Sequence, residues 1–239
     1  YYVVSDNHFS KQLYQIQLRP SNFHISDSIS LQYEPVSDIE AIDYCEDRSV
    51  FFTNEVNNHV YLFADGQNRK VFDSSLLTKH LALDWGTNKG LEGIAVDCEN
   101  QILYLAKERE PRFILAYDLR SDEIISMAQR DNVGDISDLK YQDGYLYVLE
   151  RKDNIISKMD VKTMQVVQRV SYKKTCSHPD GKLYSGTPYG MAEALLLTRN
   201  EIWIGLDNNG LPFSEHATKT YGLTGKNPVI LRFKRPEGF

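Results

Sequence analysis

The sequence lacks the features that mark several large classes of protein. Its 239 residues include only three cysteines and no CxxC pair, so a zinc or dithiol redox site built on that spacing is excluded. No apolar run approaches the roughly 20 residues of a membrane-spanning helix. Basic residues are not in excess, since 27 Lys and Arg stand against 33 Asp and Glu, for a net charge of −6. Nucleic-acid binding rests on clustered Lys and Arg, so we exclude that class of partner.

The three cysteines, Cys45, Cys98 and Cys176, leave at least one thiol free. Cys45 and Cys98 occupy equivalent places in two repeats, so a bridge between neighbouring units is conceivable. Two free thiols in turns is the interpretation we prefer from the sequence. The chain opens at Tyr1 without Met and shows no signal peptide, which is compatible with a trimmed exported precursor. Composition alone leaves the compartment open.

What the sequence does contain is an internal repeat. Four segments share the order apolar, Glu or Ser, mostly small, apolar, and they recur about every 50 residues, which is the length of a propeller blade. Each segment is followed by a short polar turn, a second β-rich run and a third one, as expected of antiparallel hairpins. The four segments lie at residues 38–42, 90–94, 135–139 and 190–195.

The N-terminal residues complete the count of repeats. Residues 1–6 match the second strand of a repeat and residues 13–16 match the third. The first repeat therefore lacks its inner strand and the last repeat lacks its outer strand. We therefore predict an all-β protein, a five-bladed β-propeller of four-stranded antiparallel blades, with residues 1–239 as a single domain. A six-bladed ring and a β-sandwich are the alternatives. Helix is expected only within residues 74–83. The second strands begin at Tyr2, Val50, Leu103, Leu146 and Ile202.

One position of the repeat carries oxygen ligands. It holds Glu40, Glu92, Ser137 and Glu193, and Asp138 follows in the unit where the acid is displaced by one. Because the first strand of each blade lines the axis of a propeller, we expect these side chains to meet there. Each like-charge pair costs on the order of several kcal/mol even at an effective dielectric of about 20, so protons, Arg or Lys, or a cation must compensate. An all-oxygen set favours Ca²⁺ over Zn²⁺ as the metal; structural, hydrogen-bonded carboxylates are the alternative.

A second acidic row stands near the ends of the second strands. Second strands run antiparallel to first strands, so both rows are expected on one face of the propeller. Surface ion pairs, which contribute little individually, are the alternative interpretation of this row. The row consists of Asp6, Glu55, Glu108, Glu150 and Asp207. The predicted rim of the face consists of Asp6, Asn54, Arg109, Arg151, Asp207 and Asn208.

Several of these runs resemble a known family. The runs DIEAI at residues 38–42, LEGIA at 91–95, LAKER at 105–109 and LYVLE at 146–150 are similar to motifs of the SdiA-regulated propeller family. They are nearly as similar to the related phytase-like family, named for the esterase-like activity of phytase. The similarity spans most of the chain, and the unit with LEGIA and LAKER is its most specific part.

The resemblance implies a five-bladed propeller with calcium bound by inner-strand residues. Glu40, Glu92 and Glu193 match the family's acidic position, whereas Ser137 departs from it. The resemblance also implies an exported bacterial protein of mostly undefined activity, so we expect a periplasmic or secreted protein.

We predict from these observations a calcium-binding protein whose acidic face serves as a site for a small molecule or a protein partner, acting as a monomer. The alternative is a calcium-dependent hydrolase of phosphate or carboxylic esters, in which the ion polarises the substrate and activates water. Glu55, Glu108 or Glu150 would then be the general base, and Arg109 and Arg151 would clamp a phosphate. Binding ranks first because neither row contains a His, and nearby Ca²⁺ and Arg lower the pKa of a glutamate that would have to act as base.

Overall fold

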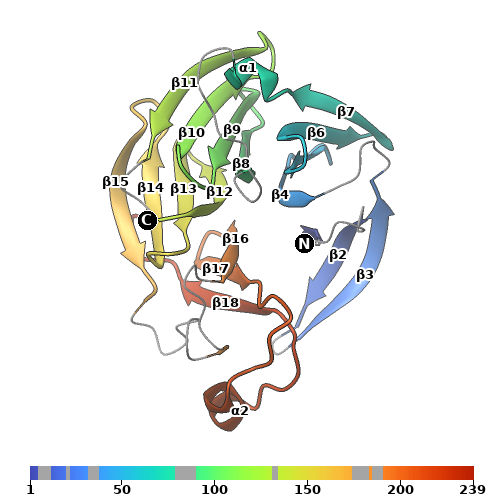
Figure 1. The fold of residues 1–239 in the computed structure, drawn as a ribbon, viewed down its shortest axis with the longest axis vertical. Coiled ribbons are helices and arrows are strands. Elements are labelled where there is room, and N and C mark those ends of the chain that lie inside the picture. The colour runs from blue at the N-terminus through green and yellow to red at the C-terminus, as the bar shows by residue number, and fades with distance from the viewer. Residues whose placement is uncertain are drawn as a thin grey trace. The chain divides into compact units, whose positions relative to one another are not determined.

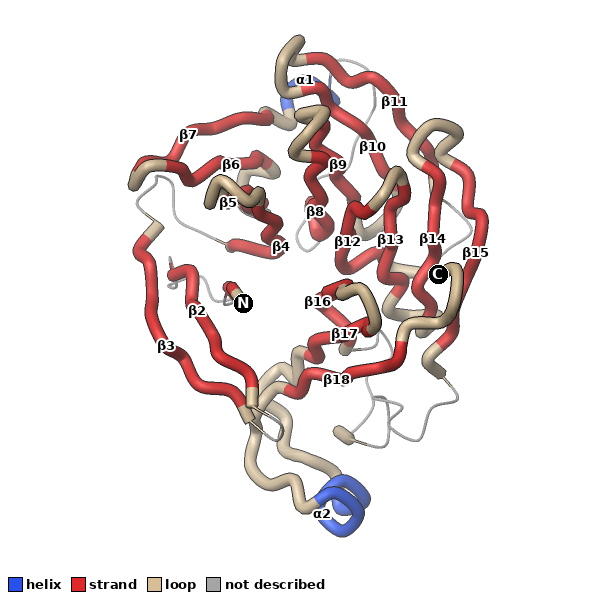
Figure 2. Tube along the Cα trace, turned by 180° about the vertical axis from the view of Figure 1, so that it is seen from behind, coloured by secondary structure: helices blue, strands red, loops and turns tan. Residues whose placement is uncertain are grey.

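Short polar turns and β-rich runs produce small antiparallel sheets along the chain. The computed structural model describes residues 1–4, 12–19, 22–31, 38–78, 90–130, 134–173, 183–184 and 191–239. These residues form five sheets, divided between two compact units, Tyr1–Gln129 and Arg130–Phe239. Figures 1 and 2 show the strands from opposite sides.

The first unit contains three sheets (Figure 1). The first sheet has the strands β1 (Tyr2–Val4), β2 (Gln12–Leu18) and β3 (Phe23–Ser30). The second has β4 (Ile39–Tyr44), β5 (Val50–Asn54), β6 (His59–Ala64) and β7 (Gln67–Phe72), and the short helix α1 (Ser75–Thr78) follows it. The third has β8 (Leu91–Asp97), β9 (Ile102–Lys107), β10 (Phe113–Asp118) and β11 (Glu123–Gln129). Neighbouring strands in each sheet are consecutive in sequence and antiparallel, so each sheet is a meander.

The second unit contains two sheets of the same kind. One has the strands β12 (Ile136–Gln142), β13 (Tyr145–Glu150), β14 (Ile155–Asp160) and β15 (Gln165–Ser171). The other has β16 (Ala192–Leu197), β17 (Glu201–Leu206) and β18 (Val229–Lys234), with the helix α2 (Glu215–Tyr221) inserted between the last two strands.

The predicted fold class is confirmed. The chain is an all-β protein with the five small antiparallel sheets of a five-bladed β-propeller. The five predicted second strands lie in five separate sheets, as β1, β5, β9, β13 and β17. Within the part of the chain that is described, the first sheet lacks an inner strand and the last sheet lacks an outer one, as the repeat pattern predicted.

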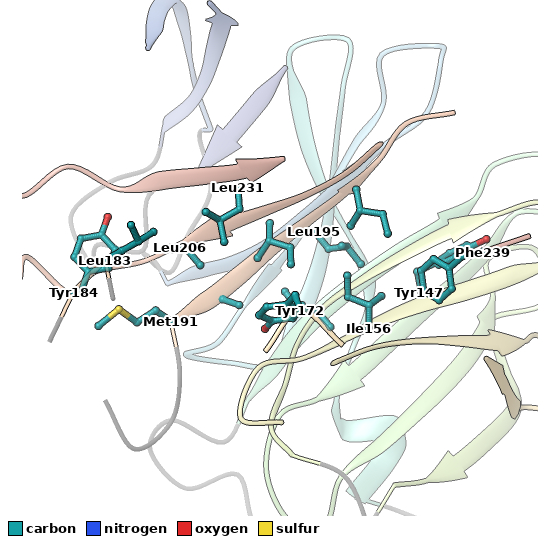
Figure 3. Close-up of a cluster of buried hydrophobic side chains, with 14 of the residues drawn as sticks. Tyr147, Ile156, Tyr172, Leu183, Tyr184, Met191, Leu195, Leu206, Leu231 and Phe239 are labelled. Carbon is teal, nitrogen blue, oxygen red and sulfur yellow. The ribbon is translucent and has the colours of Figure 1, made fainter. Parts of the chain in front are cut away.

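Burial follows the order of the strands within a sheet. The second strands β5, β9 and β13 are buried along nearly their whole length, as expected of strands covered on both faces. The outer strands β11 and β15 alternate between exposed and half-buried residues, so one of their faces meets solvent. In the second unit, Tyr147, Leu195 and Leu231 belong to one apolar cluster that joins the two sheets (Figure 3).

Helix α2 is a correction to the sequence analysis, which allowed helix only within residues 74–83. Helix α1 falls inside that range, but α2 does not. The Ser214 side chain accepts a hydrogen bond from the Ala217 N–H at the start of α2, and Gly222 ends the helix with φ 67°. Ala217 is the one buried residue of α2, so the helix has almost no apolar periodicity for a sequence to reveal. Among the described residues, no helix is both long and apolar enough to cross a membrane.

The pairing of the cysteines is a second correction. Cys45 and Cys98 form a disulfide, where the sequence analysis preferred two free thiols. Cys45 follows β4 and Cys98 follows β8, and these two inner strands are neighbours in the first unit. Equivalent turns of neighbouring repeats therefore lie side by side, and the Cα atoms are 5.8 Å apart, within the range of a disulfide. Cys176 lies outside the described residues.

Candidate functional site

The acidic position of the repeat coincides with a β-bulge in each of the four inner strands that the structure describes. Strands β8, β12 and β16 each lose register across one residue, and those residues are Glu92, Ser137 and Glu193. In β4 the irregularity lies between Ile39 and Ile42 and contains Glu40. A bulge leaves one residue out of the ladder and re-aims its side chain, so the repeat sets these four side chains apart from the regular sheet.

Main-chain hydrogen bonds define the second row. In the four sheets that have a described inner strand, the residue after the second strand donates its N–H to the carbonyl of the residue just before the inner strand, over 2.9–3.2 Å. The equivalent residues are therefore Glu55, Glu108, Arg151 and Asp207. The sequence analysis had placed Glu150 in this row, but the register gives the place to Arg151.

Glu150 instead ends β13 and is only 2% exposed. Its Oε1 accepts hydrogen bonds from Arg130 Nη2 at 3.1 Å and from Ser157 Oγ at 2.8 Å. Arg169 Nε in turn donates to Ser157 Oγ at 3.3 Å. This carboxylate thus has two partners, a half-buried cation from the residue that follows β11 and a hydroxyl from β14 of its own sheet.

In the first unit, three carboxylates converge. Asp38 precedes β4, Glu40 lies in its bulge and Glu55 follows β5, so the antiparallel pairing of β4 with β5 brings all three to one end of the sheet. Their ligand oxygens lie within 4.8 Å of one another. Asp38 is buried, whereas Glu40 and Glu55 are half-buried. Among the residues that the structure describes, this is the group of acids whose geometry can hold a metal ion.

The neighbouring sheet holds this cluster in place. Glu55 Oε1 accepts a hydrogen bond from the Gly90 N–H at 3.3 Å, and Asn58 Oδ1 accepts one from the Leu91 N–H at 3.1 Å. A Cβ on Gly90 would stand 2.3 Å from Glu55 Cγ, so only glycine lets β8 start this close. Within β4 and β5, the Ala41 N–H donates to Thr53 Oγ1 at 3.0 Å, which gives the bulge a partner.

The next sheet of the first unit carries its acids differently. Glu92 is 9% exposed and Glu108 is 1% exposed. Glu108 pairs with Arg109, whose Nε lies 3.0 Å from its Oε2. Lys107 is fully buried and donates from Nζ to the carbonyl of Arg109 at 2.8 Å. Glu108 therefore has a cationic partner and Lys107 a main-chain partner close by.

In the second unit the corresponding side chains bind one another. Glu193 forms an ion pair with Arg151. Ser137 Oγ donates to the carbonyl of Ala192 at 2.6 Å, and Asp138 Oδ2 accepts from the Leu195 N–H at 2.7 Å. The Ser137 and Asp138 side chains thus tie β12 to β16, and Arg151 balances the charge of Glu193.

The side chains of the remaining predicted rim residues form hydrogen bonds within turns and connections. Asn54 is fully buried, and its Oδ1 accepts from the Asn57 N–H at 3.4 Å. Asn208 Nδ2 donates to the carbonyl of Leu211 at 2.7 Å, which shapes the connection that leads to α2. Asp207 Oδ1 accepts from the Asn209 N–H at 2.9 Å. Asp6 lies outside the described residues.

Asp38 is the residue that sequence reasoning missed. It begins the first acidic motif, two residues before Glu40, but the repeat offers Gly90, Asp135 and Met191 at the same place and so shows no uniform acid there. Its carbonyl accepts the hydrogen bond from the Glu55 N–H at 2.9 Å, which places the two carboxylates together. The sequence feature that could have revealed Asp38 is its place just before the inner strand, which pairs directly with the second acidic row in an antiparallel sheet.

A comparison with known families shows which family the chain belongs to. The model of the family described as SdiA-regulated matches residues 21–178, which is more than half of the chain. The chain belongs to the SdiA-regulated family. The resemblance of the LEGIA and LAKER runs, which lie inside the matched segment, is thereby confirmed. No curated protein matches this SdiA-regulated chain.

Solved structures resemble the chain in fold at low sequence identity. The WD40 repeats of RRP9 share 14% identity over 80% of this chain and 50% of that chain, with a TM-score of 0.48. The Pan2 WD40 domain of Neurospora crassa shares 11% over 95% of this chain and 64% of that chain, with a TM-score of 0.48. The glutaminyl cyclase of Myxococcus xanthus shares 13% over 71% and 62%, with a TM-score of 0.44. The chain spans less than two thirds of each of these proteins, and a likeness at this level carries no information on function.

Proposed function

We propose that this SdiA-regulated protein binds Ca²⁺ in its first unit, with Asp38, Glu40 and Glu55 as ligands. The observation that supports the proposal is the approach of the three carboxylates to within 4.8 Å. Two like charges about 4 Å apart repel by about 1 kcal/mol in water and about 4 kcal/mol near a protein surface, so this cluster needs compensating charge. Three carboxylates form the hard, all-oxygen donor set that Ca²⁺ prefers, and the set contains neither His nor Cys.

The acidic face would then serve as a binding site for a ligand or a partner. Ca²⁺ takes about six to eight oxygen ligands, and three side chains leave positions for water or for a carboxylate or phosphate of a bound molecule. Glu40 and Glu55 are half-buried, so the ion they hold would remain within reach of solvent. Ca²⁺ would supply positive charge and Lewis acidity at this point.

The disulfide supports an extracytoplasmic location. Disulfides persist in oxidising compartments and are rare in the cytosol, where thiols are kept reduced. The Cys45–Cys98 bridge therefore fits a protein of the periplasm or of the extracellular medium.

Hydrolysis of esters, the alternative drawn from the sequence, has less support. Of the three candidate bases, Glu108 and Glu150 are at most 2% exposed and pair with Arg109 and Arg130. Both carboxylates are therefore buried and already held in ion pairs. Glu55 remains as a base, but it also belongs to the proposed ion site.

Calorimetric titration of chelator-treated protein with CaCl₂ tests the proposal. We expect one site, and we expect Asp38→Asn and Glu55→Gln each to weaken binding about 100-fold, since loss of even an outer-shell partner costs about 10- to 100-fold. Glu201→Gln is the matched control, because this carboxylate pairs with Arg232 at 2.8 Å in the second unit and should leave Ca²⁺ affinity unchanged. Protein that contains no metal by elemental analysis and gives no heat with CaCl₂ would contradict the proposal.

The same titration separates the cluster from the bulge position as the site of the ion. An ion held by the bulge residues of several repeats loses affinity in Glu92→Gln and Glu193→Gln. An ion held by the cluster loses affinity in Asp38→Asn and Glu55→Gln and keeps it in Glu193→Gln.

A further inference from the structure

The last residues of the chain fold back onto a neighbouring sheet. Residues 235–239 follow β18 and read Arg-Pro-Glu-Gly-Phe. The Arg235 N–H donates to the carbonyl of Asn200 at 2.8 Å, and the Phe239 N–H donates to the carbonyl of Pro236 at 3.2 Å. Gly238 has φ 76°, a conformation that favours glycine, and it turns Phe239 inward. The segment is thus an ordered turn at the end of the fifth sheet.

Arg235 joins two sheets of the second unit. Its Nη1 donates to Gln142 Oε1 at 2.7 Å, and its Nη2 donates to the Tyr147 hydroxyl at 2.6 Å. Both acceptors belong to the sheet β12–β15. Nη1 also donates at 3.0 Å to the carbonyl of Thr198, which belongs to the turn between β16 and β17. The planar guanidinium therefore reaches both sheets at once, as a fork of donors can and a single ammonium cannot.

Phe239 packs against an aromatic residue of the sheet β12–β15. The residue is 4% exposed, and its ring packs edge-on against Tyr147, with centroids 5.3 Å apart (Figure 3). Lys158 Nζ donates to the carbonyl of Gly238 at 2.7 Å and lies 4.3 Å above the centre of the Tyr145 ring. A hollow of about 470 Å³ adjoins the segment and is lined by Gln142, Arg199 and residues 234–239.

We propose that Gln142, Tyr145, Tyr147 and Lys158 form a peptide-docking site, and that its occupant is the chain's own segment 235–239. In this site an arginine stacks on the Tyr147 ring and Lys158 donates a hydrogen bond to a main-chain carbonyl. An aromatic side chain, two residues after a glutamate, packs against Tyr147. The docked segment fastens the fifth sheet, which has three strands among the described residues, to the four-stranded sheet beside it.

Deletion of residues 235–239 tests this proposal. Loss of a buried Phe alone costs enough to lower the melting temperature of a domain of this size by roughly 6–15 °C, and we expect a fall in that range. The synthetic peptide Arg-Pro-Glu-Gly-Phe, added at millimolar concentration, should restore most of the loss, because a short tether supplies an effective concentration of about 1 mM. Peptides carrying Arg235→Gln or Phe239→Ala should restore none of it.

Point variants of the full chain keep the test valid if the deleted chain fails to fold. Arg235→Gln and Phe239→Ala should each lower the melting temperature, and the double variant should lose less than the sum because both act through Tyr147. Arg232→Gln is the matched control, because this arginine stacks on Trp203 within the fifth sheet, 4.7 Å from its ring centre, and does not join two sheets. We expect it to lower the melting temperature less than Arg235→Gln does.

Three results would overturn the proposal. The first is a deleted chain that melts at the wild-type temperature, and the second is an unaltered peptide that restores no more than the altered ones. A wild-type dimer that disappears on deletion of residues 235–239 would show that the occupant comes from a second copy.

Discussion

Each unit contains a pair of neighbouring inner strands, β4 with β8 in the first and β12 with β16 in the second. The side chains at the starts of these strands differ between the two units. The first unit gathers Asp38, Glu40 and Glu55 there, whereas the second pairs Glu193 with Arg151. Arg151 occupies the place in the repeat that Glu55 occupies in the first unit. At the bulge position, Ser137 stands where the first unit has Glu40. Two changes of residue within the repeat therefore separate a cluster of three acids from an internal ion pair.

One kind of contact between the inner strands occurs in both units. In the first unit, Asp43 Oδ2 accepts the N–H of Val96 at 2.9 Å. In the second, Asp138 Oδ2 accepts the N–H of Leu195 at 2.7 Å. A carboxylate thus bridges two separate sheets through a charge-assisted hydrogen bond in each unit.

The far ends of the strands differ again. The Cys45–Cys98 disulfide joins the turns after β4 and β8. In the second unit the equivalent region holds Gln142 and Thr198, which Arg235 bridges. The ends of the neighbouring inner strands are therefore joined by a covalent bond in the first unit. In the second unit they are joined by hydrogen bonds and aromatic packing.

Loss of the disulfide should have the largest effect on this comparison. We expect Cys45→Ser combined with Cys98→Ser to lower the free energy of unfolding by about 2–5 kcal/mol, because the bridge constrains the unfolded chain between the two residues. Urea unfolding under non-oxidising and non-reducing conditions measures it, with Cys176→Ser as the control that keeps the bridge. An unchanged urea midpoint in the double variant would show that the first unit does not depend on its covalent link.

A substitution at Gly90 tests how tightly the first unit is packed beside the cluster of Asp38, Glu40 and Glu55. Gly90→Ala should cost about 1–3 kcal/mol of stability, since the added Cβ overpacks the site and displaces Glu55. The approach to Glu55 Cγ would be 2.3 Å. Calorimetry should also show weaker Ca²⁺ binding in this variant.

Gly134→Ala is the matched variant in the second unit. Its added Cβ would meet Lys152 Cβ at 2.9 Å, a less severe overlap than that at Gly90. We expect a smaller loss of stability and no change in Ca²⁺ affinity. Equal effects of both substitutions on Ca²⁺ binding would mean that Gly90 acts only through general stability.

Arg151 tests the electrostatic difference between the units. Arg151→Gln leaves Glu193 without its cation and should cost about 1 kcal/mol, because the Glu193 side chain keeps 30% of its exposure and water replaces part of the interaction. Addition of Glu193→Gln should recover much of that loss. Purely additive losses in thermal unfolding would indicate that the two side chains do not interact in solution.

An exposed ion pair of the first unit should have the smallest effect. The hydrogen bond from Lys70 holds the pKa of Asp73 below its usual range, so this pair stabilises the protein above the ordinary carboxyl pKa and the contribution is lost as the pH falls through the lowered pKa. Lys70→Gln should raise the pKa of Asp73 in an NMR titration. Its cost in stability at neutral pH should stay below about 1 kcal/mol, as for other surface pairs. A pKa that does not move would assign the shift to the Ser75 N–H instead.

Register explains which parts of the site could be predicted. The bulge residues Glu92 and Glu193 were found from the sequence because the apolar residues around them recur regularly. Glu150 and Arg151 are adjacent polar residues at the end of β13, and nothing local shows which of them occupies the second row. The hydrogen bond from the Arg151 N–H to the carbonyl of Asp135, 3.0 Å long, decides it.

The sequence by itself determined the number of sheets, their antiparallel order and the acidic position of the inner strands, because periodicity and turns act over a few neighbouring residues. Only the tertiary structure decided that Asp38 joins Glu40 and Glu55, that Cys45 meets Cys98, and that Arg151 neutralises Glu193. Each of these contacts joins residues from different strands or turns. Their distance depends on how strands and sheets pack, and packing is a property of the whole unit that no single repeat encodes.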